Sequence, residues 1–251
     1  SAFAYGTTYF SAVAFIGFAG KQGWLFGLNS LWIGVGNAVF GAGIAWLVLA
    51  RRTRTMTQNL NTMTMPEFLE KRYESAHMKM IAAVIIFVFL LPYSAGVFKG
   101  LGHLFESTFH ISYDFALLIL VGITGLYLVL GGYFAVTATD FIQGFIMLAG
   151  AIGMMIVIVH NAGGLKEAIV VANTNYQEHI PVTQRPTILT IVSLVFMTSF
   201  GTWGLPQMVQ KFYSIRSRSD VTRAMIIASV FALFMSFGAY YSGALTHLYY
   251  H

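Results

Sequence analysis

Cysteine is absent from this 251-residue sequence, and charged residues make up only 9% of it. The lack of cysteine excludes disulfide bonds and thiolate metal sites. Soluble domains carry about 25% charged residues, so a chain this poor in charge cannot cover a water-facing surface. With 57% hydrophobic residues and a mean hydropathy of +0.71, the composition predicts a multi-pass protein embedded in a lipid bilayer.

Apolar stretches of roughly 20 residues, the length that crosses a bilayer as a helix, recur along the chain. We place seven helical spans at about 1–20, 31–50, 80–102, 115–134, 138–160, 187–206 and 224–248. A short helix is expected between the second and third spans, because Thr64 can cap it with Pro66 in its first turn and Glu67 three residues later. The loop 161–186 is expected to carry an amphipathic helix.

The basic residues indicate how the chain is oriented. Alternation of the spans puts loops 51–79, 135–137 and 207–223 on one side of the membrane. That side holds ten of the fourteen Lys and Arg residues: Arg51, Arg52, Arg54, Lys71, Arg72, Lys79, Lys211, Arg216, Arg218 and Arg223. Basic loops stay in the cytoplasm, so 51–79 and 207–223 are expected there, and 161–186 outside. The net charge of +5 is therefore a topology signal and does not indicate a nucleic-acid partner.

Two of the predicted spans are interrupted. Gly6, Thr7 and Thr8 break the first apolar run, and the sixth run contains Gly204 and Pro206 in its second half. Gly and Pro open the helical hydrogen-bond ladder, which a membrane tolerates where the backbone is buried in protein or lines a wet cavity. Paired interruptions in the two halves of a chain point to a transport site. The alternative is that small residues only allow close helix packing.

Four motifs in order carry a resemblance to a known family. They are Met63–Leu69 with Arg72 and Tyr73, Leu104–Phe109, Leu130–Val136 with Thr139, Asp140 and Gln143, and Trp203–Gln207. This pattern resembles the sodium/solute symporter family across essentially the whole chain. The region from Thr62 to Gln143 is similar to the bacterial sodium/proline symporters, although Tyr133 stands where the family usually has Leu, Met or Phe.

The resemblance implies an all-α membrane protein with an inverted five-helix-repeat (LeuT-like) transporter core. Residues 1–160 would form the complete first repeat, 161–186 an extracellular loop, and 187–251 the first two helices of the second repeat. Because the family's core has ten helices and this sequence supplies seven, we expect it to be part of a longer protein. No basic region precedes the first apolar run, so no signal peptide is expected in it. The bacterial inner membrane is the location that the resemblance implies.

For sodium, the resemblance implies a site at the backbone carbonyls of Ala4 and Thr7, where the first core helix unwinds. Oxygen donors suit this hard cation. The family adds hydroxyl ligands from an eighth helix that lies beyond this sequence. Asp140, near the cytoplasmic start of the fifth span, is a further candidate on the ion's exit path, since an intramembrane carboxylate is costly. Its alternative role is to cap the fifth helix, where the helix dipole favours a negative charge.

For the solute, hydroxyl and aromatic residues around the two interruptions are the candidates. They are Thr8, Tyr9, Phe10, Ser11, Ser30, Tyr93, Thr198, Ser199, Thr202 and Trp203. The alternative for the hydroxyls is a hydrogen bond back to their own helix. The resemblance places aromatic residues of the proline symporters at Thr198 and Thr202, which favours a solute other than proline.

Together these patterns predict sodium-coupled symport of a small polar organic solute by alternating access, with sodium as the cofactor. A transporter-like sensor that signals through an attached module is the alternative. The sequence contains no nucleophile and base arrangement, phosphate loop or histidine spacing typical of a metal site, so an enzyme is not expected. It carries no signal for the oligomeric state.

Overall fold

The computed structural model describes residues 2–10, 13–213, 215 and 218–249, which form helices and turns without a strand. Within these residues, six helical segments are long and apolar enough to cross a membrane: Gly17–Asn59, Ala76–Phe109, Tyr113–Gly132, Ala138–Asn161, Val182–Trp203 and Asp220–Leu248. Five of them agree within seven residues at each end with the predicted spans 80–102, 115–134, 138–160, 187–206 and 224–248. The segment Gly17–Asn59 contains the predicted span 31–50 and also the end of the predicted span 1–20. That span includes residues 11 and 12, which lie outside the described part of the chain.

The N-terminal part is helical on both sides of a sharp turn. It comprises α1 (Ala2–Tyr9), the π-helix η1 (Val13–Gly20), α2 (Lys21–Phe26), the 3₁₀ turn η2 (Gly27–Ser30), α3 (Leu31–Gly36), the π-helices η3 (Asn37–Ile44) and η4 (Trp46–Ala50), and α4 (Arg51–Asn59). The chain reverses at Gly27, whose φ of +56° and ψ of −144° are readily adopted only by glycine. The predicted spans 1–20 and 31–50 imply a loop at 21–30. That loop is wrong, because helix α2 continues to Phe26 and the chain changes direction at Gly27.

Helix α5 (Met65–Tyr73) begins as predicted. The Thr64 hydroxyl accepts a hydrogen bond from the Glu67 N–H at 3.4 Å, and the Glu67 carboxylate accepts one from the Met63 N–H at 3.0 Å. The Met63 N–H lowers the pKa of Glu67, which keeps this reciprocal cap charged.

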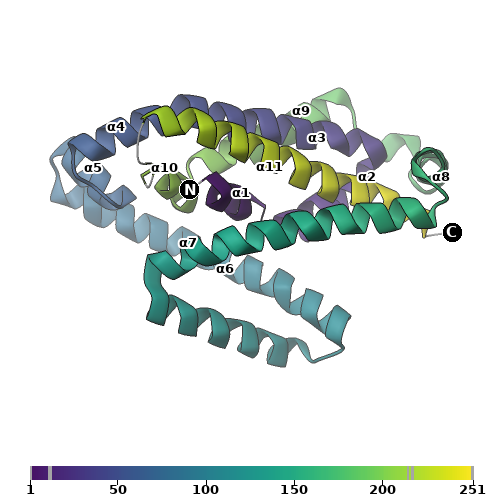
Figure 1. Ribbon diagram of the computed structural model, residues 1–251, viewed down its shortest axis with the longest axis horizontal. Coiled ribbons are helices and arrows are strands. Elements are labelled where there is room, and N and C mark those ends of the chain that lie inside the picture. Colours follow the sequence, from purple (N-terminus) through teal and green to yellow (C-terminus); the bar gives the residue numbers. More distant parts are fainter. Residues whose placement is uncertain (1, 11–12, 214, 216–217, 250–251) are drawn as a thin grey trace.

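Two long helices follow, and the second one is broken. Helix α6 spans Ala76–Phe109, and α7 spans Tyr113–Asn161 with a kink at Gly132, where φ is +53° and ψ is −150°. The kink divides α7 into the segments Tyr113–Gly132 and Ala138–Asn161, which diverge in Figure 1. The predicted turn at 135–137 is thus displaced to the glycine that can adopt a positive φ.

The remaining elements are α8 (Leu165–His179), η5 (Val182–Gln184), α9 (Ile188–Trp203), α10 (Pro206–Tyr213), α11 (Arg218–Leu245) and η6 (Thr246–Leu248). Helix α8 confirms the helix expected in the loop 161–186. In Figure 1, α4, α5, α10 and the Gly132 kink lie toward one end of the molecule, whereas α8 and the C-terminus lie at the other. This is the grouping that alternation of the spans predicts.

Helix α11 is the centre of packing and contacts α1, η1, α2, η3 and η4 along its length. Just over half of the residues in the most apolar stretch of α11 are buried, and the same holds for the segment 17–59. In the corresponding stretches of α6, α9 and both parts of α7, few residues are buried. Gly23 and Gly243 allow the backbones of α2 and α11 to approach closely, as small residues do between membrane helices.

Gly23→Val is expected to lower the free energy of unfolding by about 1 to 3 kcal/mol, the usual cost of overpacking. A Cβ atom at Gly23 would lie 2.5 Å from the backbone oxygen of Tyr240, which cannot rotate away. Gly125→Val is the matched control, because no atom lies within 4 Å of a Cβ at Gly125. Thermal unfolding in detergent measures both variants, and equal midpoints would contradict the close contact.

Candidate ion and solute site

Two neighbouring cavities lie beside α1 and α9, where both helices end. One has a volume of about 260 Å³ and is bounded by η1, η3, α9 and α11, and the other has a volume of about 360 Å³ and reaches α6. They share the lining residues Tyr9, Ala14, Phe18 and Thr202. The two hollows therefore form one region at the helix interruptions.

The structure brings most of the predicted solute residues to this region. Tyr9, Phe10, Thr198 and Thr202 line the smaller cavity, and Thr8, Tyr9, Tyr93 and Thr202 line the larger one. Ser199 is fully buried beside them on α9. Ser11 lies outside the described residues.

The interruption of the sixth predicted span is present. Helix α9 ends at Trp203, the Leu205 N–H donates to the Thr202 carbonyl at 3.2 Å, and α10 starts at Pro206. Helix α1 ends at Tyr9, whose phenol donates to the Thr198 carbonyl at 3.2 Å. This contact brings the ends of the two helices together across the cavity.

A buried asparagine in η3 connects α9 with α11, and the sequence analysis missed it. The Asn37 carbonyl oxygen accepts hydrogen bonds from the hydroxyls of Thr198 at 2.6 Å and Ser199 at 3.1 Å. Its amide nitrogen donates to the Tyr240 phenol at 3.4 Å. The signal that could have found it is its position as the only amide in the predicted span 31–50, since a buried amide needs partners.

Hydrogen bonds back to their own helix also occur, as the alternative reading held. The Thr202 hydroxyl donates to the Ser199 carbonyl at 2.8 Å, and the Thr198 hydroxyl also lies 2.7 Å from the Leu194 carbonyl. Both threonines nevertheless line the cavity. The same side chains can therefore satisfy their helix and present oxygen atoms to a solute.

The predicted sodium residues are placed on another side of α1. Thr7 and Asp140 line a third cavity of about 470 Å³, together with Gln143 of α7 and Met235 of α11. Ala4 and Thr7 are both within helix α1, and the chain leaves the helix only after Tyr9. The expected unwinding at Ala4 and Thr7 is therefore wrong, because α1 stays helical through Tyr9 and Thr7 lies in its last turn.

Asp140 forms a buried ion pair that the sequence did not reveal. The Lys211 ammonium lies 2.7 Å from an Asp140 carboxylate oxygen, and the two side chains are 7% and 16% exposed. Asp140 does not cap a helix start, because α7 is already helical before it and its non-helical residue is Gly132. The capping role expected for this residue is therefore wrong.

Two predicted solute residues lie elsewhere. The Ser30 hydroxyl is buried at the Gly27 turn and donates to the Gly27 carbonyl at 2.6 Å. The Trp203 indole donates to the Phe40 carbonyl at 3.1 Å. Neither residue lines the three cavities described above.

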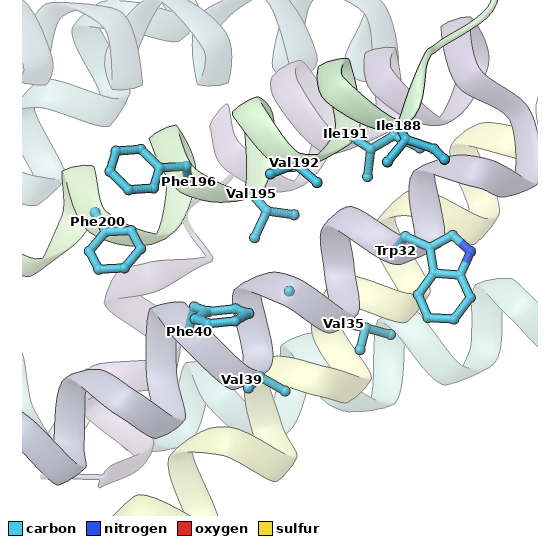
Figure 2. Close-up of a pocket in the computed structure, with 11 residues that line it drawn as sticks. Trp32, Val35, Val39, Phe40, Ile188, Ile191, Val192, Val195, Phe196 and Phe200 are labelled. Atoms are coloured by element: carbon cyan, nitrogen blue, oxygen red, sulfur yellow. The ribbon is translucent and has the colours of Figure 1, made fainter.

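A fourth hollow is an apolar groove between α9 and the second predicted span, with a volume of about 610 Å³ (Figure 2). Its walls carry aliphatic and aromatic side chains, among them Trp32, Phe40, Val195 and Phe196. A solute or ion site needs a few placed polar groups, which this lining does not supply. This groove is therefore not a candidate for the ion or solute site.

Known proteins are similar to this chain over most of its length. A family model described as "Sodium:solute symporter family" matches residues 1–249. The high-affinity proline transporter PutP of Bacillus subtilis (strain 168) is 32% identical over 249 residues, which cover 94% of this chain and 52% of that protein. The sodium/proline symporter of Escherichia coli (strain K12) is 29% identical over 218 residues, which cover 86% and 43%. The chain spans about half the length of the curated relatives it matches.

Proposed function

Because this chain belongs to the sodium:solute symporter family, we propose that it carries out sodium-coupled symport of a small polar organic solute by alternating access. The observation that supports this most is the pair of cavity regions around the end of α1. Phe10 lines both the smaller hydroxyl-lined cavity and the cavity of Thr7 and Asp140. A movement of this helix end would therefore change the shape of both cavities. Coupling between ion and solute binding requires such a shared element.

On the solute side, the cavity presents the groups that bind a small polar molecule. Hydroxyls of Thr8, Thr198 and Thr202 supply hydrogen-bond donors and acceptors, and the rings of Tyr9 and Tyr93 form apolar walls. This mixture of a few polar groups among apolar ones is typical of small-molecule sites. Proline is the first solute to test, because the similar proteins named above are proline transporters. The threonines at positions 198 and 202, where those proteins are expected to have aromatic residues, favour instead a molecule more polar than proline.

On the ion side, oxygen-bearing side chains gather in a lining that also contains three methionines. The hydroxyl of Thr7, the carboxylate of Asp140 and the amide of Gln143 line one cavity, and hard cations such as sodium take oxygen ligands. When sodium is bound here, its charge would offset the carboxylate and favour one arrangement of α1, so that solute binding depends on the ion.

The packing supports the proposed inverted repeat. The first two predicted spans of the first half lie within the described residues 2–10 and 13–59. They pack against α9 and α11, the first two helices of the second half, and α11 contacts α1, η1, α2, η3 and η4. In transporters of this architecture the site lies between the repeats at interrupted helices. We further propose that 51–79 and 207–223 face the cytoplasm of a cell whose membrane the protein spans.

Transport of the native protein, translated from its complete reading frame and reconstituted into liposomes, tests the proposal. An inward sodium gradient is expected to drive accumulation of a radiolabelled solute, with proline and other small amino acids as first candidates. A potassium or choline gradient of the same size should not. Solute binding without sodium-driven accumulation would favour the sensor instead and would overturn symport.

A further inference from the structure

The ion pair of Lys211 and Asp140 joins two helices that are far apart in the sequence. Asp140 belongs to α7, and Lys211 belongs to the short helix α10, which follows the break at Gly204 and Leu205. The Lys211 side chain is buried and that of Asp140 is only 16% exposed, and a charge shielded from water that loses its partner is strongly destabilising. The Asp140 carboxylate therefore requires a cation beside it.

The same carboxylate borders the proposed ion cavity. Asp140 lines that cavity with Thr7 and Gln143, whereas Lys211 is outside its lining and approaches the carboxylate through Oδ2. A cation that enters the cavity and approaches Asp140 meets a carboxylate whose negative charge the Lys211 ammonium already compensates. Sodium and Lys211 would thus compete for one carboxylate.

Helix α10 connects this competition to α1. Phe212, next to Lys211, stacks on Tyr5 of α1 with a centroid distance of 5.6 Å and meets the Trp46 ring at 5.0 Å. The helix also contacts α4. Helix α10 is therefore bonded to α7 through Lys211 and packed against Tyr5 of α1 through Phe212.

We propose that Lys211 is a tethered cation that holds Asp140 while sodium is absent, and that sodium replaces it. Lys211 is then a positioning residue that lowers the apparent sodium affinity and links ion occupancy to the attachment of α10. This inference rests on the proposed function, because it takes sodium as the ion. It adds an internal competitor that the symport mechanism does not itself require.

Sodium-dependent thermal unfolding of the native protein in detergent tests the proposal without transport. Each variant is purified in sodium chloride and measured at increasing sodium, with choline chloride keeping the ionic strength constant. Lys211→Met is expected to unfold at a lower temperature than wild type in choline, because the carboxylate is then uncompensated. Sodium should restore most of the loss, with half of the effect at a concentration about tenfold or more below that of wild type.

The controls separate this role from a merely structural one. Lys211→Arg keeps the competing charge and should retain the wild-type sodium dependence. Lys79→Met removes an ion pair of similar length, 2.8 Å to Glu70, that is half exposed and should show no change in sodium dependence. Asp140→Asn combined with Lys211→Met removes both charges and should abolish the gain in sodium affinity.

The outcomes also separate this proposal from symport. If Lys211→Met lowers the unfolding temperature equally in sodium and choline, or cannot be purified even in sodium, Lys211 is structural and the proposal is overturned. The same holds if the double variant keeps the high sodium affinity. In either case, sodium-driven uptake by the wild type would leave symport intact. Wild type without sodium-driven uptake, but with this pattern in the variants, would overturn symport alone.

Discussion

Thr202→Trp is expected to lower solute affinity by about 100-fold or more, equivalent to about 2.7 kcal/mol, and with it to abolish uptake. Thr202 lines both hollows of the solute region, so an indole at this position would occupy the space that the solute needs. Thr202 does not line the cavity of Thr7 and Asp140, and sodium should therefore still stabilise the variant. Equilibrium binding of labelled solute and sodium-dependent unfolding measure the two effects.

Two variants of the same helix serve as controls. Thr202→Ser keeps the hydroxyl and the space, so it should retain most of the affinity. Phe200→Trp adds an indole on the apolar groove of Figure 2 rather than in the solute region, and should leave binding unchanged. Wild-type uptake by Thr202→Trp would show that the solute binds elsewhere.

Asn37→Leu is expected to reduce both stability and solute affinity. The substitution removes the acceptor of the Thr198 and Ser199 hydroxyls, and a buried polar group left without its partner costs about 1 to 3 kcal/mol. Thr198 also lines the solute cavity, so its release should weaken solute binding by about tenfold, or 1.4 kcal/mol. Thermal unfolding and solute binding report the two losses separately.

A double-mutant cycle tests whether the loss arises from the orphaned hydroxyl. Ser199→Ala in the Asn37→Leu background removes one unsatisfied group and should recover part of the stability, although each single change is destabilising. Strictly additive effects would contradict the hydrogen bond between Asn37 and Ser199.

The sequence predicted the parts of this protein that depend on local pattern. Apolar length placed five spans within seven residues at each end. The Thr64 and Glu67 cap and the break before Pro206 were predicted from residues within one or two helical turns. Turn positions were less accurate where a single glycine decides. At Gly27 and Gly132 the chain reverses or kinks by a positive φ, and a sequence with many glycines does not reveal which one adopts it.

The site was predictable only for its residue types. Thr8, Tyr9, Thr198 and Thr202 line two neighbouring cavities, and the Tyr9 phenol reaches the Thr198 carbonyl. Asn37 and Lys211 act through partners far away in sequence, 161 residues for Thr198 and 71 for Asp140, and a single sequence carries no record of such pairs. Lys211 in particular stands among the basic residues of a predicted cytoplasmic loop, where topology explained its charge and concealed its partner.

The close approach of Gly23 and Gly243 has a consequence for how the protein is made. Helix α11, which packs against the N-terminal segment, is synthesised about 220 residues after it, which takes roughly 10 to 45 s at 5 to 20 residues per second. During that interval the polar and interrupted backbone around Tyr9 lacks its α11 neighbours. The growing chain must therefore be sheltered by the insertion machinery until α11 emerges, and the time spent on the ribosome becomes part of the folding problem.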